Sequence, residues 1–398
     1  MTTFPIARTC PFAPPAEYRE LRESAAVVPV RVPNGAPTWA VTRLEEARKV
    51  LSDPRFSHDS SRTGFPTVHQ IPAGAPGEPT PEGQFQSMDG AEHQRYRRLV
   101  QGQFTVPKVR TLRPAIQAIV DQAIDDMLER GAPADLVEDL GLPVPSLVIC
   151  RLLGVPYEDR EFFQSRTHTM AVVTDDPSQA RAAMAELHEY LRGLVDRNSG
   201  TPGDGLIGRL AADHLPTGEL TRESLTTIAI MLLVAGHETT GNMIPLGMLA
   251  LMRDPEQYAR LRADPDLIPG AVEELLRYLS IVDWVAFDRQ ATEDLELGGR
   301  QLRAGDGVWI LGASANRDER AFDRPDELDV ERGARNHIAF GYGIHQCLGQ
   351  NLARAELEIT YRTLMTRVPT LRLAVPYEDL PFKYDAAIFG LRRLPVAW

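Results

Sequence analysis

Helical periodicity is the feature that most restricts how this 398-residue chain can fold. Long segments repeat apolar residues at three- and four-residue spacing, which is the pattern of amphipathic helices. These segments predict helices over residues 44–52, 92–102, 110–130, 158–170, 178–197, 222–251, 268–279 and 349–366. Strand patterns are fewer, and they predict a hairpin near residues 27–42 and short strands within 284–311. The expected fold class is therefore mainly α with a small β portion.

Composition and charge narrow the class of protein. The chain is 43% hydrophobic and 25% charged, as globular proteins are, and no linker divides it, so we expect one domain over residues 1–398. A formal charge of -12 argues against a nucleic-acid or membrane-surface binder. The most apolar run, IAIMLLVAG, has only nine residues and no signal peptide is recognised, so we expect a cytoplasmic monomer without a membrane partner.

The segment 57–87 contains too many prolines and glycines for a regular helix or strand. A loop of this length within a compact domain usually covers a functional site or is disordered. We therefore predict a substrate-covering loop over residues 57–87.

The stretch FGYGIHQCLGQ surrounds Cys347 with three glycines and a histidine. Four interpretations compete: a buried core thiol, a nucleophile, a zinc ligand, or a thiolate bound to another metal. A core thiol is the usual state of a free cysteine. Here the cysteine directly precedes a predicted helix, whose unpaired N–H groups and dipole favour a thiolate.

The remaining interpretations differ in the partners that they need. Zinc is less favoured because no second cysteine or histidine pair lies at finger or ribbon spacing. A nucleophile needs a base and an orienting group, which spacing alone does not exclude. A single axial thiolate to haem iron needs no other protein ligand, and it is the most economical interpretation.

The same residues carry a resemblance to a known family. Phe340, Gly341, Gly343, His345, Cys347 and Gly349 match the pattern FGxGxHxCxG, which resembles the haem-binding signature of the cytochrome P450 monooxygenases. The resemblance implies the P450 fold, with haem b between the long helix 222–251 and the cysteine-bearing segment 340–366. It makes Cys347 the iron ligand, and it assigns Phe340, Gly341, His345 and Gly349 to the cofactor site.

The segment AGHETT interrupts an apolar helix with an acid and an alcohol. A threonine hydroxyl in a helix often bonds back to the carbonyl four residues earlier, which is the simpler explanation. The segment resembles the oxygen-activating helix of the family, in which such a pair relays protons. By that match Glu238 is the acid, Thr239 is the alcohol, and Ala235 lies against the cofactor.

Two further segments match the family in order along the chain. In EELLR, Glu274 and Arg277 lie at i and i+3, which alone usually indicates a surface ion pair. The resemblance makes them structural, with Arg332 of LDVER as the third member. It also assigns His93, Arg97 and Arg289, together with His345, to the haem propionates, although a solvated basic helix face is the simpler explanation for the first two.

The resemblance also implies a substrate pocket lined by Met231, Val234, Ala235, Val282, Val285, Ile388 and Phe389. A lid-like helix pair over residues 158–200 and the loop 57–87 are expected to close it. Gly241 and Pro245 depart from the expected pattern inside the long helix. Because proline lacks the N–H that the carbonyl of Gly241 would accept, we predict a kink that widens the pocket.

The implied activity is insertion of one oxygen atom from O2 into a bulky hydrophobic small molecule, by hydroxylation or epoxidation. Electrons would come from NAD(P)H through a separate reductase and a ferredoxin. A basic docking face for ferredoxin is expected from Arg95, Arg98, Lys108, Arg110, Arg335 and Arg354. The alternatives are a peroxide-driven peroxygenase, a haem-based sensor and, more remotely, a cysteine hydrolase without haem.

Overall fold

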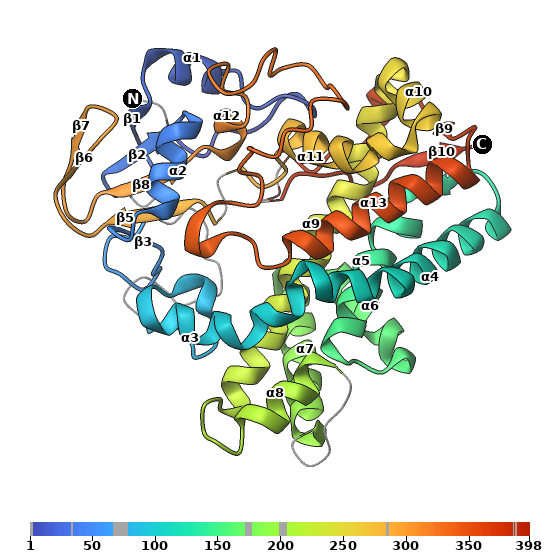
Figure 1. The fold of residues 1–398 in the computed structure, drawn as a ribbon, viewed down its shortest axis with the longest axis horizontal. Helices are drawn as coiled ribbons and strands as arrows, with labels where there is room; N and C mark the ends of the chain where they lie inside the picture. The colour runs from blue at the N-terminus through green and yellow to red at the C-terminus, as the bar shows by residue number, and fades with distance from the viewer. Residues whose placement is uncertain are drawn as a thin grey trace.

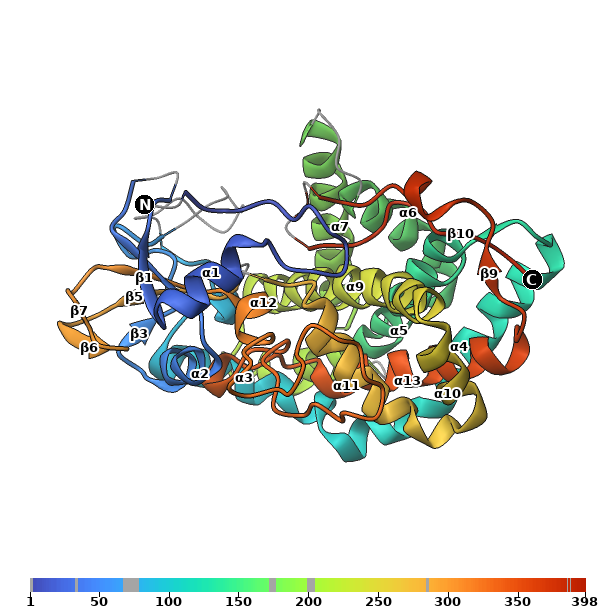
Figure 2. The ribbon, with the colours of Figure 1, turned by 90° about the horizontal axis from the view of Figure 1, so that it is seen from above.

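The structure is a computed structural model that describes residues 3–32, 35–66, 79–171, 177–198, 205–283, 286–384, 386 and 388–398. Its α-helices are α1 Glu17–Ser24, α2 Leu44–Ser52, α3 Gly90–Gln101, α4 Val106–Arg130, α5 Pro143–Leu153, α6 Arg160–Ala171, α7 Pro177–Asn198, α8 Leu206–His214, α9 Arg222–Arg253, α10 Pro255–Ala263, α11 Ile268–Leu279, α12 Gly312–Ala315 and α13 Gln350–Arg367. Its strands are β1 Val27–Val30, β2 Thr38–Val41, β3 Phe56–Ser57, β4 Ala134–Asp135, β5 Asp288–Ala291, β6 Leu295–Leu297, β7 Arg300–Leu302, β8 Gly307–Ile310, β9 Arg372–Leu373 and β10 Pro395–Ala397. The main sheet lies at one end of the molecule, and α9 passes through the helical part at the other (Figure 1 and Figure 2).

The predicted helices are confirmed as α2, α3, α4, α6, α7, α9, α11 and α13, with ends within four residues of the prediction. The helices α1, α5, α8, α10 and the short α12 were not predicted. Most residues of α5 are buried, so its sequence lacks a polar face and its periodicity is weak. Helix α10 has the opposite pattern, since only Leu261 is buried among its nine residues. Periodicity therefore did not identify α5, which is mostly buried, or α10, which is mostly exposed.

The predicted hairpin is confirmed by β1 and β2, which pair antiparallel with Val27 opposite Val41. These strands join a five-stranded sheet in the order β1-β2-β8-β5-β3, in which β2 and β8 run parallel. The short strands β6 and β7 form a hairpin whose turn residues, Gly298 and Gly299, both have positive φ. Two such residues form the turn that best suits a two-residue hairpin. Helix α2 packs on one face of the sheet, and their buried residues form one hydrophobic core. The helical part of the molecule has a separate core.

Helix α9 begins at a well-defined cap. The Thr221 hydroxyl accepts a hydrogen bond from the Ser224 N–H over 3.0 Å, and the Ser224 hydroxyl accepts one from the Thr221 N–H over 2.9 Å. This reciprocal pair satisfies two donors at the helix start. Gly83 of the loop 57–87 lies against this turn, because a Cβ there would stand 2.3 Å from the Ser224 carbonyl oxygen. The described end of that loop is therefore packed on α9, while residues 67–78 lie outside the described residues.

The kink predicted at Gly241 does not interrupt α9, and a widening of the pocket stays a prediction. Helix α9 remains one element from Arg222 to Arg253, through Gly241 and Pro245. Gly241 does not line the cavity described below, and a Cβ on it would stand 2.8 Å from the Gly141 carbonyl oxygen. Gly141 lies equally close to the Gly241 carbonyl, which Pro245 cannot bond. The Gly241 position is therefore explained by close packing of α9 on the turn that ends at Gly141.

No helix in the described ranges is long and apolar enough to cross a membrane.

Candidate functional site

A largely apolar cavity lies between α9 and the loop that carries Cys347. Its walls include Met231, Leu232, Ala235, Gly236, Thr239, Thr240 and Met243 of α9, and Phe340, Gly341, His345, Cys347, Leu348 and Gly349 of the loop. Phe85, Gln86 and His58 add the two described ends of the segment 57–87. Residues far apart in the sequence therefore enclose one space, with the cysteine and the Thr239 hydroxyl both facing it.

Cys347 is accessible from this cavity and is otherwise surrounded by protein. Its N–H donates to the Phe340 carbonyl over 2.8 Å, which closes the loop on itself. Burial raises the pKa of the thiol, while the N–H groups of Gly349 and Gln350 and the charge of Arg97 oppose that rise. The N–H donors expected at the helix start are therefore present. Without a metal cation, they lower the pKa of the Cys347 thiol by less than burial raises it. A positive ion in the cavity would reverse this balance.

Glycines give the loop its shape. Gly341 and Gly343 have φ of 70° and 73°, a region that other residues rarely adopt. A Cβ on Gly343 would also stand 2.2 Å from the Leu51 carbonyl oxygen of α2. Gly349 differs, because a Cβ there would meet no protein atom within 4 Å although the residue lines the cavity. The space beside Gly349 is therefore open for a ligand next to the Cys347 sulfur.

Five basic side chains gather at the cavity, and only two of them have a carboxylate partner among the described residues, His58 with Asp288 over 3.3 Å and His345 with Asp89 over 3.5 Å. They are His58, His93, Arg97, Arg289 and His345. The His93 and His345 rings lie 4.2 Å apart, and both ring nitrogens of His93 lack a hydrogen-bond partner in the described part of the chain. Arg97 donates to the Gln346 carbonyl over 2.5 Å, and Arg289 donates to backbone carbonyls, the shorter contact being 2.7 Å to Asp288.

The pKa values reflect this crowding. Burial, followed by the charges of His345 and Arg97, lowers the pKa of His93 to about 4. Burial also lowers the pKa of His345 to about 4 and that of Arg289 to about 10. Buried cations and unpartnered ring nitrogens call for carboxylates. The two propionates of a haem bound at Cys347 fit this need, and the open space at Gly349 fits its flat ring.

Helix α9 presents Thr239 to the cavity and Glu238 to its flank. The Thr239 hydroxyl donates to the Ala235 carbonyl over 2.9 Å, which is the back-bonded arrangement considered above as the simpler explanation. Its oxygen still has lone pairs for a donor in the cavity. Glu238 does not line the cavity, and burial raises the pKa of its carboxyl.

The structure brings Glu274, Arg277 and Arg332 together in the interior. Arg277 donates to both carboxylate oxygens of Glu274 over 2.7 Å, and both side chains are fully buried. Arg332 Nε donates to the same carboxylate over 3.1 Å. Arg277 also donates to the carbonyls of Asn316 and Pro325. These contacts tie α11 to the segment that precedes the Cys347 loop, so a surface ion pair is excluded for this motif.

The pocket prediction is partly wrong. Met231, Ala235, Val282 and Ile388 line the cavity, and Val285 lies outside the described residues. Val234 does not line it; it is 37% exposed, because it projects from another side of α9. Phe389 is also absent from the wall, since its ring stacks on Phe382 and is covered by Arg8. No described side chain of α6 or α7 reaches the cavity.

Two members of the predicted basic face are engaged elsewhere. Arg354 pairs with Glu273, with contacts of 2.5 and 3.1 Å, and lies over the Phe340 ring. Arg95 lies over the Tyr96 ring and pairs with Glu92. The other four are Arg98, Lys108, Arg110 and Arg335, none of which forms an ion pair with a described residue.

Sequence reasoning missed Glu356 of α13. This residue lines the cavity, is 3% exposed, and has no partner for its Oε2 atom among the described residues. Burial raises the pKa of its carboxyl to about 8. An acid on the apolar side of a predicted helix was the available signal, since such a residue is rarely buried without a role. His58 was also missed, because an isolated histidine in a loop carries no pattern.

The pKa of Glu356 predicts a pH dependence of stability. The folded protein keeps this proton up to about pH 8, whereas the unfolded chain loses it near its ordinary pKa, so the free energy of unfolding falls as pH rises between the two values. Glu356→Gln should remove that fall and gain about 4 kcal/mol over the parent at pH 8. Urea denaturation at pH 5 and pH 8 measures it. The exposed Glu129 supplies the control, Glu129→Gln, and an equal pH dependence in parent and Glu356→Gln would contradict the prediction.

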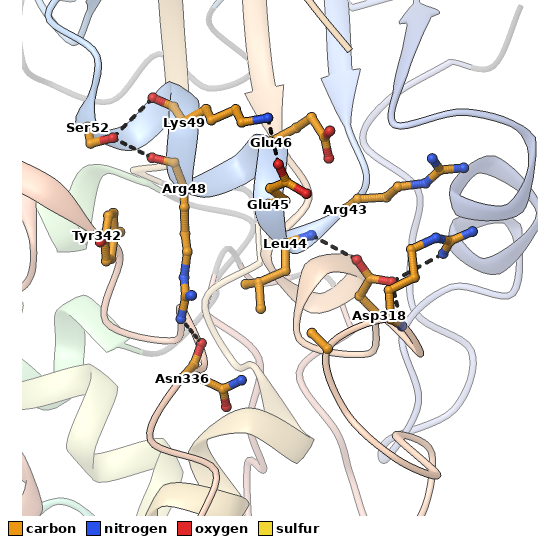
Figure 3. Close-up of a pocket in the computed structure, with 12 residues that line it drawn as sticks. Arg43, Leu44, Glu45, Glu46, Arg48, Lys49, Ser52, Asp318, Asn336 and Tyr342 are labelled. Carbon is orange, nitrogen blue, oxygen red and sulfur yellow. Dashed lines mark hydrogen bonds and ion pairs between the residues drawn. The ribbon is translucent and has the colours of Figure 1, made fainter.

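A second cleft lies on the surface between α2 and the segment 318–342 (Figure 3). Its charged groups are largely paired with one another. Lys49 pairs with Glu45 over 2.7 Å, Arg48 donates to the Asn336 carbonyl, and Asp318 accepts from the Leu44 N–H over 3.1 Å. This cleft is therefore explained by its own contacts, and the chemistry belongs to the internal cavity.

Comparisons with known proteins agree with this geometry. The family model for cytochrome P450 matches residues 37–368. The chain is 48% identical to cytochrome P450 105A3 of Streptomyces carbophilus, over 99% of this chain and 95% of that protein. The crystal structure of cytochrome P450 MoxA from Nonomuraea recticatena is 51% identical with a TM-score of 0.93, over 100% of this chain and 98% of that one. Mycinamicin VIII C21 methyl hydroxylase of Micromonospora griseorubida, solved with mycinamicin VIII bound, is 45% identical with a TM-score of 0.91, and both chains are covered completely.

Proposed function

Because this chain belongs to the cytochrome P450 family of monooxygenases, we propose that it oxidises a bulky hydrophobic secondary metabolite, by hydroxylation or epoxidation, with electrons from a ferredoxin. The observation that carries the proposal is the apolar cavity that Cys347 and Thr239 share. Haem bound there supplies the redox chemistry of oxygen activation. Cys347 would hold its iron, and His93, Arg97, Arg289 and His345 would hold its propionates.

The chain's own part in the reaction is to position the substrate and to deliver protons. Apolar side chains such as Met231, Val282 and Ile388 line the cavity and would orient a hydrophobic substrate by shape. The Thr239 oxygen can accept a hydrogen bond from a water molecule in the cavity. Glu238 would take up a proton from outside and pass it toward that hydroxyl. The loop 57–87 and the helix pair 158–200 are proposed to open and close the pocket.

The proposed substrate class is supported by the relatives. One of them hydroxylates mycinamicin VIII, as its name states. Large apolar walls and few polar groups suit such a molecule. Compounds of polyketide, macrolide, terpenoid or sterol-like type are the candidates, and a spectral shift of the haem on binding would identify the one that fits.

Ferredoxin is proposed to dock on the Cys347 side of the molecule. Tyr342 and Ile344 of the cysteine loop are 41% and 44% exposed, which leaves an apolar patch on the loop that carries Cys347. Arg98, Lys108, Arg110 and Arg335 have no ion pair with a described residue and are available to an acidic partner. NAD(P)H and a separate reductase would supply the ferredoxin.

The proton relay is tested by two variants, Thr239→Ala and Glu238→Gln. Each should lower product formed per NAD(P)H consumed by about tenfold or more, while NAD(P)H consumption continues, because removal of a positioned proton donor typically costs at least this much. Thr227→Ala is the matched control, since the Thr227 hydroxyl makes the same back-bond on α9, 3.0 Å to the Glu223 carbonyl, and does not line the cavity. Unchanged coupling in both variants would contradict the relay.

Peroxide-driven oxidation is the alternative function. The same preparation distinguishes the two, by turnover with hydrogen peroxide alone against turnover with ferredoxin and reductase. Equal rates would favour the peroxygenase, and product only with the electron-transfer proteins supports the monooxygenase.

A further inference from the structure

Lys383 is a buried lysine in a chain that has few lysines. Of the 43 lysine and arginine residues, only Lys49, Lys108 and Lys383 are lysines. Lys383 is 7% exposed, and an ammonium group buried to this degree needs a compensating partner. Arginine stays charged in proteins, whereas the charge of a buried lysine responds to its surroundings. The Lys383 ammonium is therefore expected to compensate a nearby polar or charged group.

The partner groups of Lys383 lie on the flank of α9. Its Nζ donates to Asn242 Oδ1 over 3.0 Å. Asn242 is one helical turn after Glu238, so both side chains project from the same side of the helix. The Lys383 N–H donates to the Gly390 carbonyl over 2.9 Å, within a hairpin that also carries Ile388. A Cβ on Gly390 would stand 2.1 Å from Asn242 Oδ1, so the hairpin packs directly against α9 at this point.

The charges of Lys383 and Glu238 each shift the pKa of the other group. Burial raises the pKa of the Glu238 carboxyl, and the Lys383 charge is the largest influence that opposes the rise, followed by Asn242. Burial lowers the pKa of the Lys383 ammonium. The charge of Glu238 raises this pKa, and the charge of Arg392 lowers it further. The Asn242 side chain acts on the same carboxyl through a side-chain hydrogen bond, which favours the Glu238 carboxylate.

We propose that Lys383 is a positioning residue for proton delivery: with Asn242, it holds the Glu238 carboxylate charged on the hairpin side of α9, outside the cavity wall. This inference rests on the relay proposed above. Thr239 lines the cavity and Glu238 does not, so a proton reaches the cavity in two transfers. The Glu238 carboxylate first binds a proton from solvent, and the resulting carboxylic acid then donates it toward the Thr239 hydroxyl. The Lys383 charge favours the return of Glu238 to the carboxylate after each transfer.

The test compares Lys383→Met with Lys49→Met in the haem-loaded protein. Titration of the Glu238 carboxyl is followed by its infrared C=O band, which is assigned by its loss in Glu238→Gln. Without the Lys383 charge, the midpoint of this titration should rise by about one pH unit or more. Product per NAD(P)H at neutral pH should fall several-fold, and the acid limb of its pH profile should move to higher pH. Lys49 is a surface residue paired with Glu45, so Lys49→Met should match the parent in each measurement.

A double variant separates positioning from a merely structural role. If Lys383 acts through Glu238, adding Lys383→Met to Glu238→Gln should change the coupling less than twofold. This double variant leaves no unpaired carboxylate at position 238, which protects it against misfolding, and the carbon monoxide spectrum checks its haem site. An unmoved Glu238 midpoint, or an equal loss of coupling in both backgrounds, would overturn the inference. If Glu238→Gln alone leaves coupling unchanged, the proposed relay fails, while the infrared midpoint still decides whether Lys383 controls Glu238.

Discussion

A Cys347→Ala variant should lose the strongly red-shifted Soret band of the reduced, carbon monoxide-treated protein, and monooxygenase turnover should disappear with it. The reason is that Cys347 is the cysteine whose sulfur faces the cavity, with the N–H groups of Gly349 and Gln350 directed at it. A thiolate ligand to haem iron is what produces that band and supports oxygen activation. The measurement is an absorption spectrum of purified protein produced with ample haem.

The other two cysteines are the matched controls for this variant. Cys150 is buried on α5, where burial raises the pKa of its thiol to about 12, and Cys10 is exposed. Cys150→Ala and Cys10→Ala should therefore retain the red-shifted band. A band that survives in Cys347→Ala, or no haem absorbance in the parent, would contradict the assignment and return Cys347 to the interpretations of nucleophile or core thiol.

An Arg277→Met variant should be destabilised by about 3–5 kcal/mol, which is the usual cost of leaving one partner of a buried ion pair alone. Glu274 would remain fully buried with Arg332 as its remaining cation, and the carbonyls of Asn316 and Pro325 would lose their donor. Because these contacts tie α11 to the segment before the cysteine loop, haem content should fall as well. Urea denaturation and the haem-to-protein absorbance ratio measure the two effects.

Arg260 provides the surface comparison for Arg277. It is 43% exposed and pairs with Glu256 and Glu331, so Arg260→Met should cost no more than about 1 kcal/mol. Adding Glu274→Leu to Arg277→Met should recover part of the loss, because it removes the isolated carboxylate. If Arg277→Met were as stable as Arg260→Met, the buried network would not be the structural centre that its contacts indicate.

Features carried by local spacing could be predicted well from the sequence. The helices α9 and α13 each have a periodic pattern over many residues, and the cysteine loop combines turn-forming glycines with a helix start. The family and the fold that these features implied are confirmed by the comparisons. The expected role of Glu274 and Arg277 needed more, since the same spacing on an exposed helix would be a weak ion pair. Only the complete burial of both side chains distinguishes a structural pair in the core from a weak ion pair on the surface.

Other features depend on contacts between distant segments and could not be predicted. Val234 and Thr239 are five residues apart on α9, yet only Thr239 lines the cavity, because the rotation of the helix is set by its packing on α5 and Gly141. Glu356 is an unpaired buried acid only because the cavity lies beside α13.

The sequence by itself determined most of the helices, the cysteine loop and the family, because neighbouring residues decide turns, caps and amphipathic faces. The tertiary structure alone decided which side of α9 faces the cavity and which groups surround Glu238. Lys383 lies 145 positions further along the chain than Glu238, and no local pattern relates two residues so far apart. Close packing at Gly390 brings them to the same flank of α9, where low solvation makes each charge depend on the other.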